Sequence, residues 1–170
     1  MPQVSFVISV HNGENFLENC IDSVLNQTFE DFECIILNNG SIDKTQEILE
    51  QFTDSRLKII HQENIGVSRS LNKGIHLAKG SLIARLDVDD ISSADRLEKQ
   101  VGFMIENPKI VLCGSRFREL IKDTSLPQKV AFIKMDKSIR KSMSLFNPFA
   151  HSTVMFRRKT FIDSGGYSEK

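Results

Sequence analysis

Apolar residues in the first two thirds of the chain form short continuous runs that alternate with segments of helical periodicity. Runs rich in β-branched residues, such as residues 4–10, are typical of buried strands. Between them, apolar residues recur three and four positions apart, as at Leu17, Ile21 and Val24, which is typical of amphipathic helices. The pattern predicts strands at residues 4–10, 32–37, 57–60, 82–86 and 110–113, and helices at residues 14–27, 43–52, 67–78 and 93–107.

This alternation of strand and helix predicts the α/β class, with a mainly parallel sheet, helices on both faces and right-handed crossovers. The length favours one domain over residues 1–170. Beyond Ser115 the pattern loosens, and residues 116–134 predict no definite element. We expect a helix at residues 136–145, a strand at 152–156 and a helix at 158–164 that ends at Gly165.

The fourth predicted strand leads into the most informative stretch of the chain. Residues 82–84 are apolar, and after Arg85 the chain places carboxylates at Asp87, Asp89 and Asp90. Ligands of open α/β sheets bind at this end of the strands. Clustered carboxylates repel one another unless a cation or a hydroxyl-rich ligand takes up the charge. Taken alone, the stretch predicts a metal site and a solvated acidic loop equally well.

Two other polar loops are expected at the same edge of the sheet. The first strand ends near Ser9, His11 and Asn12, and the second ends near Asn38 and Asn39. Each group has an ordinary alternative as a loop histidine, a turn-forming asparagine or surface charge. Because parallel strands bring all these loops to one edge, the set favours a binding cleft.

The residue types in this cleft suggest a diphosphate-linked substrate. An Asp-x-Asp segment places two carboxylates on the same side of an extended chain, about 7 Å apart. Mg²⁺ or Mn²⁺ held by few protein oxygens keeps coordination positions open for phosphate. An asparagine amide both donates and accepts, which suits the edge of a base. A metal held here would assist departure of a nucleoside diphosphate.

Composition narrows the possible partners. The chain has 22 basic and 22 acidic residues, so it lacks a basic field for nucleic acid. Cys20, Cys34 and Cys113 fit no zinc or disulfide spacing, and we interpret them as reduced core thiols, which favours the cytoplasm. We expect no secretory leader and no transmembrane run, although peripheral attachment to the inner face of a membrane stays open.

Several motifs occur in a fixed order along the chain. They are VSFVISVHN at residues 4–12, SVLNQTFEDF at 23–32, NNGSIDKT at 38–45, the Asn-rich and Gly-rich segment at 64–80, DVDD at 87–90, the segment at 147–156 and GGY at 165–167. This ordered set resembles glycosyltransferase family 2, whose members have the GT-A fold. The family's corresponding stretches include Val-Ser-Val-Ile-Ile-Pro-Val-Tyr-Asn, Asp-Asp-Gly-Ser-x-Asp-x-Thr and Asp-x-Asp-Asp.

The resemblance implies a role for particular residues. Residues 1–114 would form a Rossmann-like, nucleotide-sugar-binding part, and residues 115–170 an incomplete acceptor part. His151 resembles a family histidine near the acceptor side, with a packing histidine as the alternative. Asp89 and Asp90 would hold Mn²⁺ or Mg²⁺. The donor-binding positions would be Ser9, Val10, His11, Asn39, Arg69, Asp87 and Asp89, although an exposed helix arginine is an equal alternative for Arg69.

Three departures from the family pattern affect these expectations. Asn38 and Asn39 replace two aspartates of the family pattern, so a neutral amide rather than a carboxylate would accept a hydrogen bond from the base. Ser9 and His11 replace the usual proline and tyrosine. The family's catalytic base lies in a Glu-Asp motif that follows the GGY segment, and in this sequence only Glu169 is acidic there. We therefore expect a chain truncated before the base motif, and no catalytic residue is assigned.

The family resemblance implies an inverting, metal-dependent glycosyltransferase that uses a nucleoside-diphosphate sugar, with UDP as the first choice. The acceptor would be a polysaccharide or a lipid-linked saccharide. The alternative is a truncated or inactive nucleotide-sugar-binding module without turnover. A dinucleotide-binding oxidoreductase would need three glycines after the first strand, where only Gly13 is found. A receiver domain would need an acidic pair where His11 and Asn12 stand.

Overall fold

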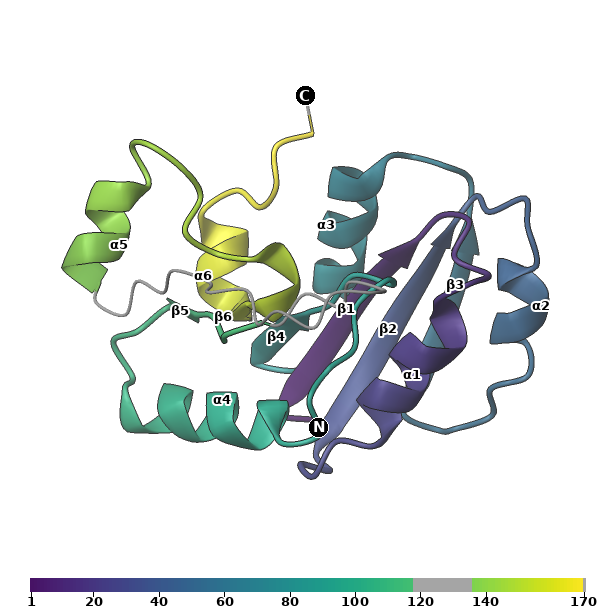
Figure 1. Cartoon of the computed structure of the whole chain (residues 1–170), viewed down its shortest axis with the longest axis horizontal. Coiled ribbons are helices and arrows are strands. Elements are labelled where there is room, and N and C mark those ends of the chain that lie inside the picture. Colours follow the sequence, from purple (N-terminus) through teal and green to yellow (C-terminus); the bar gives the residue numbers. More distant parts are fainter. Residues whose placement is uncertain (118–135, 170) are drawn as a thin grey trace, which may run out of the picture.

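The computed structural model describes residues 1–117 and 136–169, which build a twisted six-stranded sheet (Figure 1). The strands lie in the order β3-β2-β1-β4-β6-β5. Their bounds are β1 (Val4–Val10), β2 (Phe32–Asn39), β3 (Leu57–Gln62), β4 (Leu82–Arg85), β5 (Leu112–Cys113) and β6 (Met155–Arg157). Strands β1 to β4 run parallel, whereas β6 is antiparallel to both β4 and β5. The predicted mainly parallel α/β sheet is confirmed.

Helices cover both faces of the sheet, as predicted. On one face, α1 and α4 pack against a buried cluster that includes Phe6, Ile8 and Ile36. On the other, α3 and α6 pack against a second cluster around Val7 and Ile83. The helices are α1 (Leu17–Leu25), α2 (Thr45–Leu49), α3 (Val67–Leu77), α4 (Arg96–Glu106), α5 (Asp136–Ser142) and α6 (Arg158–Asp163), with a 3₁₀ helix η1 (His151–Thr153).

Strand register brings the polar loops to one edge. Val10 lies beside Asn38, and Val7 lies beside Arg85. The apolar residues of β1, β2 and β4 are buried, so these strands are fixed from both faces. The loops that leave their carboxyl ends therefore start from rigid positions, next to one another in the order β2, β1, β4.

Several predicted boundaries were wrong. The strand expected at residues 152–156 begins only at Met155, because residues 151–153 form η1, in which Thr153 Oγ1 donates to Ala150 O at 2.8 Å. The strand expected at 110–113 covers only Leu112–Cys113. Helix α1 starts at Leu17, after a turn at residues 14–16 in which the Phe16 amide donates to Gly13 O. Most of the stretch 116–134 lies outside the described residues.

The C-terminal end of α6 follows its prediction. Gly165 has φ +95°, a conformation in which side chains are strained, and its N–H donates to Ile162 O. Gly166, with φ +75°, donates to Phe161 O. The two glycines reverse the chain and bring Tyr167 against α6, with its ring centroid 4.9 Å from that of Phe161.

Candidate donor-binding site

Hydrogen bonds tie the loop after β1 to the loop after β2. His11 Nδ1 lies 3.1 Å from Asn39 O, and Asn12 N donates to Ser41 Oγ at 3.0 Å. Asn12 Oδ1 accepts from Ile42 N at 2.9 Å. The predicted convergence of these two loops is thus present in the structure. The His11 side chain is exposed, whereas Val10 is fully buried and has no exposed surface in this structure.

Asn39 is 3% exposed, and its amide makes three hydrogen bonds within the protein. Its Oδ1 accepts from Gln62 Nε2 at 2.9 Å and from Ile65 N at 3.1 Å, and its Nδ2 donates to Asn64 Oδ1 at 3.3 Å. Beside it, Asn38 Oδ1 accepts from Ser41 N at 3.2 Å. These amides hold the loops after β2 and β3 together.

Ser9 and Arg69 face different partners, although both were expected near the donor. Ser9 Oγ lies 2.8 Å from Ser70 Oγ, and so links the end of β1 to α3. Arg69, in the first turn of α3, is exposed and lies 3.6 Å from the carboxylate of Glu169. Asn72 also donates to Glu169, at 2.7 Å. The Glu169 carboxylate is therefore held by α3.

The loop after β4 is held by a buried cation. Arg85 is 1% exposed, and its guanidinium donates to Asp87 Oδ1 and to the carbonyls of Leu86 and Val7. From the opposite side, Ser152 Oγ donates to Asp87 Oδ2 at 2.6 Å and accepts from Asp87 N at 2.9 Å. Both oxygens of this carboxylate therefore have a fixed protein partner.

The same contacts decide the charge of Asp87. Burial alone would raise the pKa of Asp87. Arg85, the Ser152 hydroxyl and His151 together lower this pKa by a larger amount, so it lies below its ordinary value of 3.8. Burial and the Arg85 charge bring the pKa of His151 below 6.5, although Asp87 opposes them. At neutral pH this part of the site therefore holds an aspartate anion beside a neutral imidazole.

His151 connects Asp87 to the C-terminal segment. His151 Nδ1 lies 4.0 Å from Asp87 Oδ2, and its Nε2 lies 2.7 Å from the Tyr167 hydroxyl. The two rings meet edge to face, with centroids 5.4 Å apart. Asn72 Nδ2 donates to Tyr167 O at 3.0 Å, so α3 fixes this segment as well. The predicted acceptor-side residue thus lies beside the acidic loop.

Asp89 and Asp90 differ from Asp87 because their side chains are exposed. Within residues 1–117 and 136–169, their carboxylates make no hydrogen bond or ion pair, and no group of three or more His, Cys, Asp and Glu side chains could hold a metal ion. Two free carboxylates are hard oxygen donors that suit Mg²⁺ or Mn²⁺ when substrate phosphates complete the coordination. The residues present therefore fit such a cation.

Sequence reasoning missed two partners of Asp87, namely Ser152 and Arg85. Arg85 was the only charged residue in the predicted strand 82–86, and that was a signal for a buried ion pair. Ser152 carried no comparable signal, because its contact spans 65 residues along the chain.

Comparison with known proteins decides the family. The sequence profile described as glycosyl transferase family 2 matches residues 5–165. The chain belongs to glycosyl transferase family 2. The O-antigen biosynthesis glycosyltransferase WbnJ of Escherichia coli is 34% identical to it over 170 residues, which cover 98% of this chain and 66% of that protein. The chain spans about one third to two thirds of the length of the curated relatives it matches.

Solved structures agree on the fold of this family 2 chain. TarS residues 1–349 from S. aureus superimpose with a TM-score of 0.79 and 20% identity, covering 100% of this chain and 51% of that one. The same part of TarS has been solved with UDP. The mannosyltransferase PcManGT of Pyrobaculum calidifontis, solved with GDP-Man and Mn²⁺, gives a TM-score of 0.73 at 17% identity, covering 99% and 48%. The GT-A fold expected from the sequence is confirmed.

Proposed function

We propose that this chain supplies the donor-binding part of an inverting glycosyltransferase that uses a UDP-sugar. The observation that carries the proposal is the contrast within the acidic loop, where Asp87 is held by Arg85 and Ser152 while Asp89 and Asp90 stay free at the carboxyl edge of the sheet. Fixed loops after β1 and β2 border the same edge. UDP bound to TarS supports the choice of nucleotide.

The contacts of each residue indicate its role in this proposal. Asp89 and Asp90 would hold Mn²⁺ or Mg²⁺, which when bound would act as a Lewis acid on the departing diphosphate. Asp87, kept anionic by Arg85, would accept hydrogen bonds from a ribose hydroxyl. Ser9 and His11 border the nucleotide side, and His151 faces the acceptor side. No described residue is assigned as the base that takes the acceptor proton.

The partners and the place of action belong to the same proposal. Relatives in O-antigen and amylovoran biosynthesis support a polysaccharide or lipid-linked saccharide as the acceptor. We infer action in the cytoplasm, at the inner face of the membrane. In the described part of the chain, every helix is too short or too polar to cross a bilayer.

A donor-binding module without turnover is the second candidate. The amide of Asn39, which stands where the family has an aspartate, is bound to Gln62, Ile65 and Asn64. Glu169, which follows the GGY segment, is held by Asn72 and lies near Arg69, so its carboxylate is occupied within the protein. Both observations favour binding over chemistry.

Calorimetry with UDP and Mn²⁺, together with a UDP-sugar hydrolysis assay, tests the proposal. We expect metal-dependent UDP binding that Asp89→Asn abolishes, because one of two metal-binding carboxylates is lost. Asp22→Asn removes an exposed carboxylate from α1 and is the matched control, with unchanged affinity. Binding without release of UDP would favour the module. Absence of UDP binding by the unaltered protein would exclude both candidates.

A further inference from the structure

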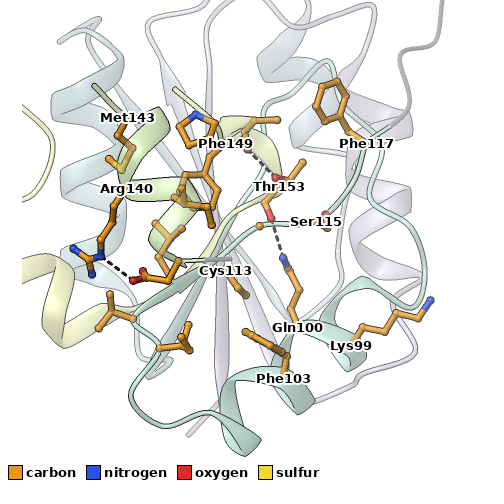
Figure 2. Close-up of a pocket in the computed structure, with 18 of the residues that line it drawn as sticks. Lys99, Gln100, Phe103, Cys113, Ser115, Phe117, Arg140, Met143, Phe149 and Thr153 are labelled. Carbon is orange, nitrogen blue, oxygen red and sulfur yellow. Dashed lines mark hydrogen bonds and ion pairs between the residues drawn. The ribbon is translucent and has the colours of Figure 1, made fainter. Parts of the chain in front are cut away.

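A cavity of about 650 Å³ lies between α4, β5 and α5 (Figure 2). Figure 2 shows Phe103 and Gln100 entering it from α4, and Met143 and Arg140 entering it from the α5 side. Its size is that of a pocket for a small molecule. No role has been assigned to it so far.

The wall of this pocket is mostly apolar and partly open to solvent. Phe103 is 44% exposed, Val111 48%, Phe117 48% and Met143 61%. Phe149 closes the wall from the segment that precedes η1. Large side chains gathered on an open surface usually mark a binding site, because their exposure to water is unfavourable.

The polar side chains of Gln100 and Thr153, which line the pocket, already have partners within the protein. Gln100 Nε2 donates to Thr153 O at 2.8 Å, and Gln100 Oε1 accepts from Arg96 Nε at 3.0 Å. Burial raises the pKa of the Cys113 thiol to about 11, so this side chain is uncharged at neutral pH. The interior therefore offers few free hydrogen-bonding groups to a sugar and suits a hydrocarbon chain.

Basic residues outnumber acidic ones along the pocket wall. Its lining includes Lys99, Lys109 and Arg140 and one acidic residue, Asp136, although the whole chain is balanced at 22 and 22. Lys99 and Arg140 each have an acidic partner on their own helix, Asp95 and Asp136. Lys109 lines the pocket without an acidic partner among the described residues. An anionic head group would therefore be attracted to the rim.

The pocket shares one element with the candidate donor site. In η1, Ser152 binds Asp87, whereas the next residue, Thr153, lines the pocket. A molecule in the pocket would therefore be separated from the acidic loop by a single turn of chain. An acceptor substrate has to bind close to the donor, so a position of the acceptor pocket next to the acidic loop is expected.

We propose that the pocket between α4, β5 and α5 binds the lipid end of an amphiphilic acceptor, with an alkyl or isoprenoid chain against Phe103 and Met143 and a phosphate at the rim near Lys109. The inference rests on the proposed function, because it names the acceptor class of the same transfer. It assigns to this pocket the lipid-linked alternative rather than a free polysaccharide.

Titration of the purified protein with dodecyl phosphate, below its micelle concentration, tests the pocket. We expect saturable binding by calorimetry, and none with inorganic phosphate, because the apolar wall supplies most of the affinity. Phe103→Asp should weaken binding at least about tenfold, since a carboxylate would enter the apolar wall and repel the phosphate. Lys109→Glu should weaken it about fivefold through reversed charge at the rim.

A matched control lies on the same helix. Ile105 is 63% exposed on α4 and does not line the pocket, so Ile105→Asp should leave dodecyl phosphate binding unchanged. If Phe103→Asp and Ile105→Asp weaken dodecyl phosphate binding equally, the proposal is overturned. Binding to phosphatidylglycerol vesicles without binding to dodecyl phosphate would also overturn it, and would indicate a membrane surface instead.

The two proposals fail in different ways. UDP affinity is measured on the same protein samples. If the unaltered protein binds UDP but does not bind dodecyl phosphate, only the proposal of a lipid pocket is contradicted. Failure to bind UDP while dodecyl phosphate still binds contradicts the donor site, and with it the assignment of the lipid as an acceptor.

Discussion

The loops after β2 and β4 leave the same edge of the sheet and differ in what their polar groups do. At the end of β2, the amides of Asn38 and Asn39 form hydrogen bonds to the loop that follows β2, to β3 and to the loop that follows β3. After β4, only Asp87 is held, and Asp89 and Asp90 remain free. One loop therefore shapes the cleft, while the other supplies charge for a ligand.

Replacement of Arg85, the buried cation, should have the largest effect on the free energy of unfolding. Arg85→Met leaves Asp87 without its cationic partner and the carbonyls of Leu86 and Val7 without a donor. We expect a loss of about 3 kcal/mol in the free energy of unfolding. Arg56→Met removes a partly exposed pair with Asp54 and should cost at most about 1 kcal/mol. Denaturant unfolding measures both, and equal losses would contradict the role of Arg85.

The shape of the β2 loop can be tested at Gly40. This residue has φ +74°, and a Cβ atom there would lie 2.6 Å from Asn64 N. Gly40→Ala should destabilise the protein by about 2 kcal/mol and weaken UDP binding, because the loop has to move. Gly102→Ala, in α4 with open space around it, should instead stabilise by about 0.5 kcal/mol. Thermal unfolding gives the sign of each change.

A charge placed in the β2 loop would make the two loops more alike. Asn39→Asp restores the residue found in the family and should tighten UDP binding about fivefold, because a charged acceptor makes a stronger hydrogen bond. Asn39→Leu is the control for the lost contacts to Gln62 and Ile65, and should lower stability. Unchanged UDP affinity in Asn39→Asp would mean that residue 39 only holds the loop.

Acid should affect the β4 loop through Asp87. The pKa of Asp87 is lowered on folding, so its contribution to stability is present above its unfolded pKa and is lost as pH falls through the lowered value. The free energy of unfolding should therefore fall between about pH 5 and pH 3. Asp87→Asn should make this fall shallower. Identical pH profiles for the two proteins would contradict the pairing with Arg85.

Sequence patterns were sufficient for β1 to β4, because their apolar runs and the intervening helices are local signals. They were insufficient for β6, whose place between β4 and β5 depends on pairing with residues more than 40 positions away. Ser152 lies in η1 rather than in a strand, and its hydroxyl contacts Asp87, 65 positions away in the sequence. Hydrophobic periodicity does not encode such contacts.

The candidate site shows the same limit. Strand ends located the polar loops correctly, because parallel strands share one carboxyl edge. The sequence alone did not show which polar groups would lack a hydrogen-bond partner in the folded protein. Asn39 and Asp89 are both polar residues at the carboxyl edge of the sheet. Asn39 is 3% exposed and makes three side-chain hydrogen bonds, whereas the Asp89 side chain is exposed without a partner among the described residues.

Paramagnetic broadening by Mn²⁺ in the presence of UDP tests the central claim most directly. In a ¹H–¹⁵N spectrum of the protein, we expect Mn²⁺ to broaden the amide signals of residues 86–90, while UDP with diamagnetic Mg²⁺ only shifts signals near His11 and Ser41. Asp89→Asn should remove the broadening. Broadening centred outside residues 86–90, or unchanged in Asp89→Asn, would contradict a donor site built on the free carboxylates.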